Sequence, residues 1–178
     1  MGNEQLGSPR MASSSIELSR LALQSGGGRR LEPELTLQAL DLGGQAYEVL
    51  GGPTPMRVDV SRTSSGWAFR LRFDVTLAGP CTRCLSEAER TISVDAREVD
   101  EAGTEDEELS SPYVAEDVLD LGSWARDALV LSVPATYLCS PDCAGLCHIC
   151  GQPLKDGAHD HAEQRDPRWD RLRELKLD

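Results

Sequence analysis

Six cysteines and three histidines, gathered in two parts of the chain, are the residues of this sequence that could do chemistry. Cys81 and Cys84 form one Cys-x-x-Cys pair, and the other four cysteines and all three histidines lie between Cys139 and His161. Thiolate and neutral imidazole are ligands that Zn²⁺ prefers, and a structural zinc usually takes four of them in a tetrahedron. The sequence therefore predicts bound zinc.

Nine donors are too many for one tetrahedral zinc and about right for two. The arrangement that we favour has one local site, made of Cys147, Cys150, His159 and His161. The second site joins distant parts of the chain and is made of Cys81, Cys84, Cys139 and Cys143. His148 is a spectator in this arrangement. Spacing leaves two alternatives open: the two Cys-x-x-Cys pairs could share one ion, or a single site could leave the other cysteines unligated.

These ligand sets leave no coordination position for water, whereas a catalytic zinc keeps one open. The sequence contains no His-Glu-x-x-His helix, no Ser/His/Asp arrangement and no phosphate-binding glycine loop after a strand. Asp160 could accept a hydrogen bond from a neighbouring histidine ligand. A redox role for Cys81 and Cys84 is the weaker interpretation, because redox pairs usually open a helix. We expect a structural metal, no enzymatic activity and no small-molecule substrate.

Alternating apolar residues predict the strands that must position these ligands. The alternation runs through residues 56–60, resumes over 67–77 and returns over 92–96. A period of two indicates strands with one buried face, so these three segments predict an antiparallel β-meander. Pro80 ends the second strand, which places Cys81 and Cys84 at a turn between strands.

One packed helix is predicted after the strands. Residues 118–121 are typical of a short edge strand, and Ser123 is the predicted N-cap of a helix that stops before Pro134. Near the end of the chain, Asp166 and Pro167 predict the start of a second, short helix.

The predicted fold class is α+β: an antiparallel β-meander or partly open barrel with a packed helix and a C-terminal zinc-binding segment. We expect residues 1–13 to be a disordered leader, with Met11 as an alternative start. Residues 14–134 form the expected β domain, which includes the helix and an acidic loop over 98–116. Residues 135–178 form the expected zinc-binding segment and C-terminal helix.

The net charge of −12 argues against a nucleic-acid binder that works by blanket electrostatic attraction. The charge is uneven: ten acidic residues and no Lys or Arg lie between Glu98 and Asp120, whereas arginine is in slight excess from Arg57 to Arg97. No stretch approaches the roughly 20 apolar residues that span a bilayer, and the N-terminus lacks a signal-peptide pattern. We expect a cytoplasmic protein with reduced thiols and no membrane partner.

Three separated motifs carry a family resemblance. Residues 80–85 read Pro-Cys-Thr-Arg-Cys-Leu, residues 139–151 follow the pattern Cys-x3-Cys-x-Gly-Leu-Cys-x-x-Cys-Gly, and residues 166–169 read Asp-Pro-Arg-Trp. In this order the motifs resemble those of the bacterial YceD family, the large ribosomal RNA subunit accumulation proteins. The resemblance covers about residues 16–177.

This resemblance implies a non-enzymatic factor that supports synthesis, processing or stability of large-subunit (23S) ribosomal RNA. The implied partner is the precursor of that RNA or a ribosomal protein. Some family members lack the 147/150 pair, which favours grouping the 81/84 pair with Cys139 and Cys143. An alternative function is an acidic protein-interaction module or holdase for a basic ribosomal protein.

The sequence departs from the family pattern at its last two ligands. Family members commonly carry Cys-x-Cys where this chain has His159-Asp160-His161. Histidine must be neutral to bind zinc, so we expect this site to weaken at acid pH.

Overall fold

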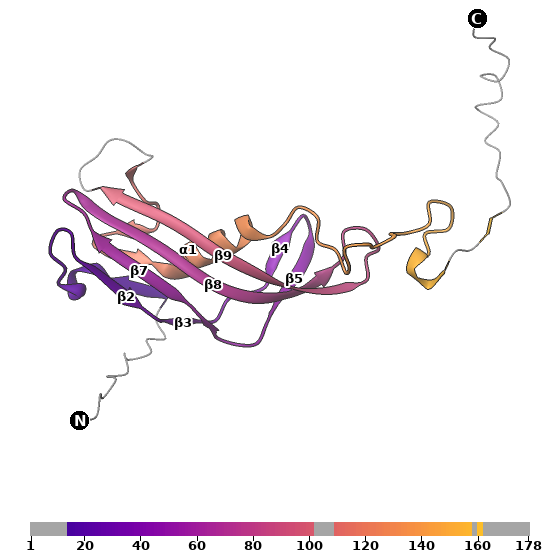
Figure 1. Ribbon diagram of the computed structural model, residues 1–178, viewed down its shortest axis with the longest axis horizontal. Coiled ribbons are helices and arrows are strands. Elements are labelled where there is room, and N and C mark those ends of the chain that lie inside the picture. The colour runs from indigo at the N-terminus through magenta and orange to yellow at the C-terminus, as the bar shows by residue number, and fades with distance from the viewer. Residues whose placement is uncertain (1–13, 102–108, 158–159, 162–178) are drawn as a thin grey trace, which may run out of the picture.

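Two long antiparallel strands run along the length of an elongated molecule (Figure 1). The computed structural model describes residues 14–101, 109–157 and 160–161. The long strands are β8 (Gly66–Pro80) and β9 (Glu87–Glu101), which pair along their whole length. β7 (Arg57–Arg62) pairs with β8 on its other edge, so the predicted β-meander is confirmed. The predicted leader, His159 and the predicted C-terminal helix lie outside the described residues.

Shorter strands widen the sheet on the β7 side of β8. β2 (Gly28–Leu31) pairs with β7. β5 (Gln45–Leu50) pairs with the part of β8 that lies beyond β7, and β4 (Leu40–Leu42) pairs with β5. Two small sheets lie beside it. One joins β3 (Glu34–Leu35) to β6 (Thr54–Pro55), and the other has the order β1 (Ser15–Glu17), β11 (Val118–Asp120), β10 (Val114–Ala115). Over the described residues the main sheet is open rather than closed into a barrel.

The core lies between the main sheet and the helix α1 (Leu121–Ser132). Alternate residues of β7, β8 and β9 point into it, because successive side chains of a strand face opposite sides of a sheet. Trp124 of α1 is almost fully buried and meets Phe69 of β8 edge-on, with ring centroids 6.2 Å apart. Among the described residues, no helix is long and apolar enough to cross a membrane.

The start of α1 differs from the sequence prediction. Asp120, not Ser123, is the N-cap: its carboxylate accepts from the backbone N–H of Ser123 (3.0 Å) and from the Ser123 hydroxyl (2.7 Å). An aspartate at this place satisfies an unpaired N–H of the first turn, as a serine would have done three residues later. Strand β11, which ends at Asp120, is the middle strand of its small sheet rather than the predicted edge strand.

The acidic segment is shorter than the predicted loop over 98–116. β9 continues through Glu101, because Val99 and its neighbours still pair with β8, and Val114–Ala115 form strand β10. Three consecutive glycines at 26–28 are typical of a break in the chain, whereas β2 starts at Gly28. Glycine weakens a strand by itself, but here pairing with β7 decides the structure.

Tyr137 fastens the segment after α1 to the end of the sheet. Its side chain is buried, and its hydroxyl donates a hydrogen bond to the backbone carbonyl of Leu77 (2.6 Å). Its ring meets that of Tyr47 edge-on, with centroids 5.0 Å apart. Gly79 makes room for this pair, because a Cβ at residue 79 would lie 2.2 Å from the Tyr47 ring. Cys139 follows directly, so this anchor fixes where the later cysteines begin.

Tyr137→Phe should lower the free energy of unfolding by about 1 kcal/mol, because a buried hydrogen bond to a backbone carbonyl is lost. Denaturant unfolding followed by circular dichroism measures the change. Tyr113→Phe is the matched control: the Tyr113 hydroxyl donates to the half-exposed Asp127 (3.2 Å). We expect the control to lose less, because its carboxylate partner is half-exposed and water can replace the lost bond. Equal losses in the two variants would contradict the anchoring role of Tyr137.

Candidate metal centre

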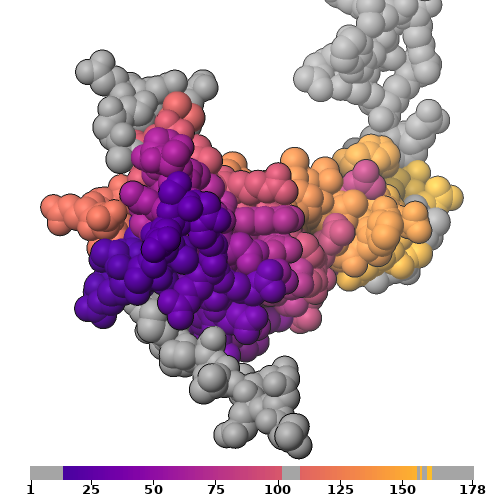
Figure 2. Space-filling model, turned by 60° about the vertical axis from the view of Figure 1, so that its left-hand side comes forward, coloured from indigo at the N-terminus to yellow at the C-terminus, as the bar shows by residue number. Residues whose placement is uncertain are grey.

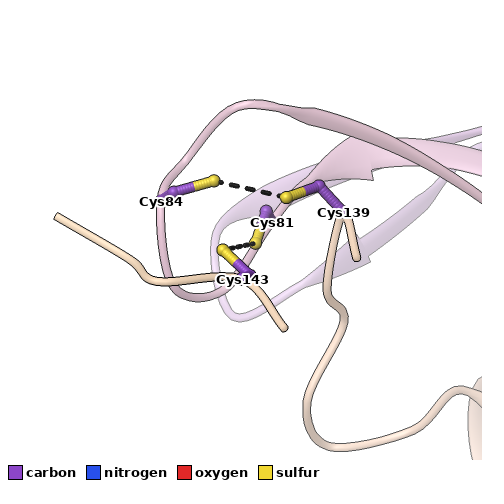
Figure 3. Close-up of side chains that lie close together, drawn as sticks. All are labelled: Cys81, Cys84, Cys139 and Cys143. Carbon is purple, nitrogen blue, oxygen red and sulfur yellow. Dashed lines mark hydrogen bonds between the residues drawn. The ribbon is translucent and has the colours of Figure 1, made fainter. Parts of the chain in front are cut away.

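The turn between β8 and β9 wraps around the sulfur of Cys81. The backbone N–H of Arg83 points at Cys81 Sγ (3.4 Å), and the N–H of Leu85 donates to the Cys81 carbonyl (2.9 Å). The N–H of Cys81 in turn donates to the carbonyl of Ser86 (2.8 Å). This closed turn presents Cys81 and Cys84 side by side, as a chelating pair (Figure 3).

Residues 147–152 repeat the same turn. The N–H of Ile149 points at Cys147 Sγ (3.4 Å), the N–H of Gly151 donates to the Cys147 carbonyl (2.8 Å), and Cys147 donates to Gln152 (2.8 Å). Both Cys-x-x-Cys pairs therefore have one backbone geometry, in which N–H groups stabilise negative charge on the first sulfur.

The two turns differ in the residue that takes the left-handed conformation. Gly151 has φ +72° in the second turn, but Leu85 has φ +59° in the first. A side chain in this region costs about 1–2 kcal/mol, whereas glycine adopts it freely. The Leu85 side chain is also 67% exposed, so its burial does not compensate for the strain. Sequence reasoning missed this position, although alignment of 81–85 with 147–151 would have revealed leucine in the place of glycine.

Four sulfur atoms from two distant segments converge at this end of the molecule (Figure 3). Cys81 Sγ lies 3.7 Å from Cys143 Sγ, and Cys84 Sγ lies 3.6 Å from Cys139 Sγ. All four sulfurs lie within 4.8 Å of one another. Zn–S bonds of 2.3 Å in a tetrahedron require sulfur atoms about 3.8 Å apart, so the four residues fit a zinc ion. The separations are far longer than a disulfide bond of about 2.05 Å.

Protein contacts hold the two segments together around these sulfurs. Thr82 donates its backbone N–H to the carbonyl of Tyr137 (2.8 Å), and the Arg83 guanidinium donates to the carbonyl of Cys143 (3.1 Å). Cys81, Cys84 and Cys143 are buried, and Cys139 is exposed. The first cluster is thus preassembled and mostly shielded from water.

The thiols of this cluster do not ionise alike. Burial raises the pKa of Cys81, but the backbone N–H groups of Cys84 and Arg83 outweigh it and lower that pKa to about 6. The N–H of Gly145 acts to lower the pKa of Cys143, yet burial and the neighbouring sulfurs raise it to about 12. Hydrogen bonds from Ser86 also lower the pKa of Cys84. The thiols of the first turn therefore ionise more readily than Cys143. A divalent cation would supply the positive charge that four thiolates need.

A second cluster forms on a hairpin that follows the first. Cys147, Cys150 and His161 bring their ligand atoms within 4.8 Å of one another, and Cys147 Sγ lies 3.2 Å from His161 Nε2. The hairpin is closed by Leu154, whose N–H donates to the carbonyl of Gly145 (2.9 Å). His148 is exposed and belongs to neither cluster. The fourth predicted ligand, His159, lies outside the described residues.

The two clusters lie next to each other at one end of the molecule, where the chain coloured orange to yellow gathers (Figure 2). Lys155, beyond the second turn, donates to the Ser86 hydroxyl at the first turn (3.0 Å). Over the described residues the structure separates the 81/84 pair from the 147/150 pair, as the favoured arrangement predicted. Whether metal occupies either cluster stays a prediction.

Comparison with known proteins places the chain in a family. The model of a family described as "Large ribosomal RNA subunit accumulation protein YceD" matches residues 69–176, more than half of the chain. The chain belongs to the YceD family. The match includes both clusters and the turn between β8 and β9. The family description links the chain to large-subunit ribosomal RNA in general terms and names no metal.

Curated relatives of this YceD-family chain come from mycobacteria. It is 37% identical over 105 residues to the uncharacterized proteins Rv2926c of Mycobacterium tuberculosis and Mb2951c of Mycobacterium bovis, which is 54% of this chain and 49% of each relative. It is 28% identical over 101 residues to the uncharacterized protein ML1660 of Mycobacterium leprae, 53% of this chain and 46% of the relative. The chain thus spans about half the length of the curated relatives it matches. No solved structure matches it.

Leu85→Gly should raise the free energy of unfolding by about 1 kcal/mol, because glycine relieves the left-handed strain. Leu85→Ala keeps the Cβ and the strain, and should leave stability nearly unchanged. Gly151→Ala introduces the same strain into the second turn and should cost about 1 kcal/mol. Thermal or denaturant unfolding of the metal-loaded protein checks all three. If Leu85→Gly does not have a higher free energy of unfolding than Leu85→Ala, the claim that Leu85 is strained is wrong.

Proposed function

We propose that this protein is a non-enzymatic ribosome-biogenesis factor that supports synthesis, processing or stability of 23S ribosomal RNA. Two structural zinc ions hold its binding surface in shape. It works in the cytoplasm and meets precursor RNA or a ribosomal protein. The observation that carries this proposal is the family match, whose description names accumulation of the large ribosomal RNA.

The geometry of the first cluster supports a structural metal. Four cysteine sulfurs that lie within 4.8 Å of one another would complete the coordination of a zinc ion and would leave no position for water or substrate. The second cluster has the same turn and would be completed by His159. The strands β8 and β9 flank the first cysteine pair, so the pair lacks the helix that activates redox thiols.

The metal content of purified protein tests the two-zinc arrangement. Protein purified without chelator should contain two zinc ions per chain by elemental analysis. Cys81→Ser and Cys143→Ser should each remove the same one, Cys147→Ser should remove the other, and a double Cys81→Ser/Cys147→Ser variant should lose both. His148→Ala, the matched control, should keep both because His148 belongs to neither cluster. If Cys81→Ser and Cys147→Ser empty one shared ion, the arrangement is wrong.

The proposed function is tested in cells. Deletion of the gene should lower the ratio of 23S to 16S ribosomal RNA, measured by electrophoresis of total RNA. Wild-type protein and the His148→Ala control should restore the ratio, whereas Cys81→Ser should not, because the turn and the later segment lose their shared ion. An unchanged ratio in the deletion strain would contradict the proposal.

A second candidate function is a holdase for a basic ribosomal protein. It is favoured by the acidic stretch, in which ten acidic residues and no Lys or Arg lie between Glu98 and Asp120. Affinity capture from ribosome-free lysate separates the candidates: RNase treatment removes partners that are held through RNA and spares a directly bound protein. Capture of a basic ribosomal protein after RNase treatment would support the holdase.

A further inference from the structure

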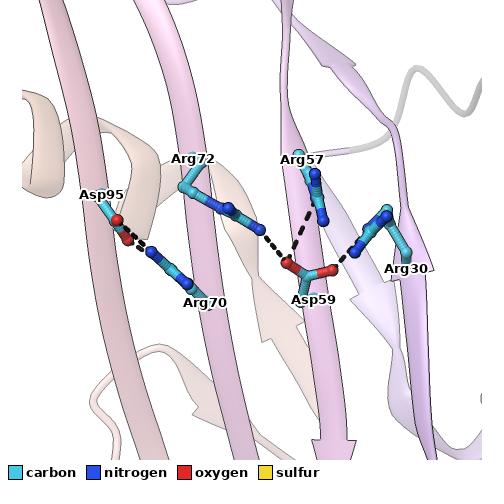
Figure 4. Close-up of polar contacts among 6 residues, drawn as sticks. All are labelled: Arg30, Arg57, Asp59, Arg70, Arg72 and Asp95. Atoms are coloured by element: carbon cyan, nitrogen blue, oxygen red, sulfur yellow. Dashed lines mark hydrogen bonds and ion pairs between the residues drawn. The ribbon is translucent and has the colours of Figure 1, made fainter.

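Arginines gather on the face of the main sheet that points away from α1 (Figure 4). We name this surface the arginine face, and it consists of Arg30, Arg57, Arg70, Arg72 and Arg97 together with Asp59, Asp74 and Asp95. The alternation of the strands explains its position: Val58, Leu71 and Val94 enter the core, so the residues between them face outward.

Like charges stand directly opposite each other twice on this face. Arg57 of β7 is paired in register with Arg72 of β8, and Arg70 of β8 is paired with Arg97 of β9. Directly opposed like charges destabilise a sheet, whereas an arginine opposite a carboxylate stabilises it. The same two rows also place Arg72 opposite Asp95 and Arg70 opposite Asp59, so across β7, β8 and β9 each row holds one like-charged and one oppositely charged pair. The like-charged pairs are a local cost, and such local costs are typical of binding surfaces.

The aspartates do not balance this charge. Asp59 is shared by three arginines: it accepts from Arg30 Nε (2.8 Å) and from Arg72, and it lies 3.4 Å from Arg57 Nε. The hydrogen bond from Arg30 is the main cause that lowers the pKa of Asp59 to about 2. This carboxylate therefore stays charged at neutral pH and still leaves two of the three arginines uncompensated.

The second aspartate is fully used by one arginine. Arg70 binds Asp95 through two hydrogen bonds, of 2.8 and 2.5 Å. Arg97, on the neighbouring strand, is exposed beside this pair. The third aspartate, Asp74, accepts from the Ser93 hydroxyl (2.6 Å) and binds no arginine. Five arginines against three aspartates give the arginine face a local excess of positive charge on a chain whose net charge is −12. A bound anion would balance this excess of positive charge.

Two guanidinium groups also have incomplete hydrogen bonding. Arg57 Nε and Arg72 Nε are shielded from water and make no hydrogen bond among the described residues, although Arg57 Nε forms an ion pair with Asp59 at 3.4 Å. A buried donor without an acceptor is costly, and a small turn of each guanidinium toward an added anion would satisfy it. These are the two arginines that stand opposite each other.

A hollow of about 720 Å³ opens beside this pair. Two arginines, Arg57 and Arg72, line it together with four carboxylates, which are those of Glu32, Glu34, Asp74 and Asp95. Arginine binds phosphate oxygens, whereas carboxylates accept hydrogen bonds from exocyclic amino groups of bases and from 2′-hydroxyls. One hollow thus offers partners for both the phosphate and the nucleoside part of a nucleotide.

We propose that the arginine face binds the phosphate backbone of unpaired RNA, with a nucleoside seated in the adjacent hollow. This inference rests on the proposed function and names the contact surface for it. The acidic remainder of the chain repels RNA elsewhere, so binding is confined to this face instead of spreading over the molecule. A basic peptide is disfavoured, because it would meet the same uncompensated arginines.

Filter binding of the full-length protein to a labelled 23S ribosomal RNA transcript tests the inference. Arg57→Gln/Arg72→Gln should weaken binding about tenfold or more near physiological salt and reduce the slope of log K against log salt by about 1.4, because two phosphate contacts are lost. Arg20→Gln/Arg126→Gln is the matched control: it removes the same charge from exposed arginines outside the sheet, and should change binding less than about twofold.

Additional measurements and a second variant make the test decisive. Circular dichroism establishes that each variant folds, and Arg97→Glu, whose side chain is exposed, replaces the double variant if that variant does not fold; about a tenfold loss is expected. A short unpaired RNA should compete better than the same strand in a duplex. Wild-type affinity in both arginine variants, equal losses in the control, equal competition by duplex, or binding of a lysine-rich peptide in place of RNA would each overturn the inference.

The cellular RNA ratio separates the two proposals. If deletion lowers the ratio of 23S to 16S RNA but Arg57→Gln/Arg72→Gln binds RNA as wild type does, the arginine face is wrong and the proposed function stands. If deletion leaves the ratio unchanged, the proposed function fails whatever the filter-binding result.

Discussion

The convergence of four cysteine thiols from distant segments is the constraint on which the rest of the structure depends. Cys81 and Cys143 are 62 residues apart, and Cys84 and Cys139 are 55 apart. A crosslink that closes so long a loop removes much of the conformational freedom of the unfolded chain. Cys81 and Cys84 supply two of the four ligands, and Cys139 and Cys143 supply the other two. A metal at this point would therefore couple the sheet to the segment that follows α1.

The long hairpin of β8 and β9 carries the first turn to the end of the molecule, away from the helix and the main core (Figure 1). There the buried residues are mainly cysteines and Tyr137 in place of the large aliphatic side chains of the middle of the sheet. Tyr137, the hydrogen bond from Arg83 to the Cys143 carbonyl and the converging thiols hold this end together. The strained conformation of Leu85 persists because these contacts fix the turn. The apolar side chains of Leu85 on the first turn and Ile149 on the second turn remain exposed. They make this end of the molecule suited to further contacts.

Local patterns predicted those parts of the structure that local physics decides. The alternation over 56–96 predicted the meander, and Pro80 placed the first cysteine pair at its turn correctly. The grouping of thiols was one of several possible pairings, because ligands distant in sequence meet only through the fold. The short strands β2, β4 and β5 were missed since pairing with neighbouring strands, rather than their own composition, forms them. The N-cap was wrong because Asp120 and Ser123 are equally good caps and tertiary position chooses between them.

The arginine face was visible in the sequence only as a slight excess of arginine. Strand register decides that Arg57 stands opposite Arg72 and that Asp59 serves three arginines at once, and register is not readable from one strand. The metal clusters and the arginine face thus lie on one sheet, with the clusters at its end and the face along its strands.

The most direct test of the central claim is NMR of the protein with ¹¹³Cd in place of zinc, in which couplings between cadmium and cysteine β-protons reveal the ligands of each ion. One cadmium should correlate with Cys81, Cys84, Cys139 and Cys143, and a second should correlate with Cys147 and Cys150. A single cadmium that correlates with both Cys-x-x-Cys pairs would contradict the account.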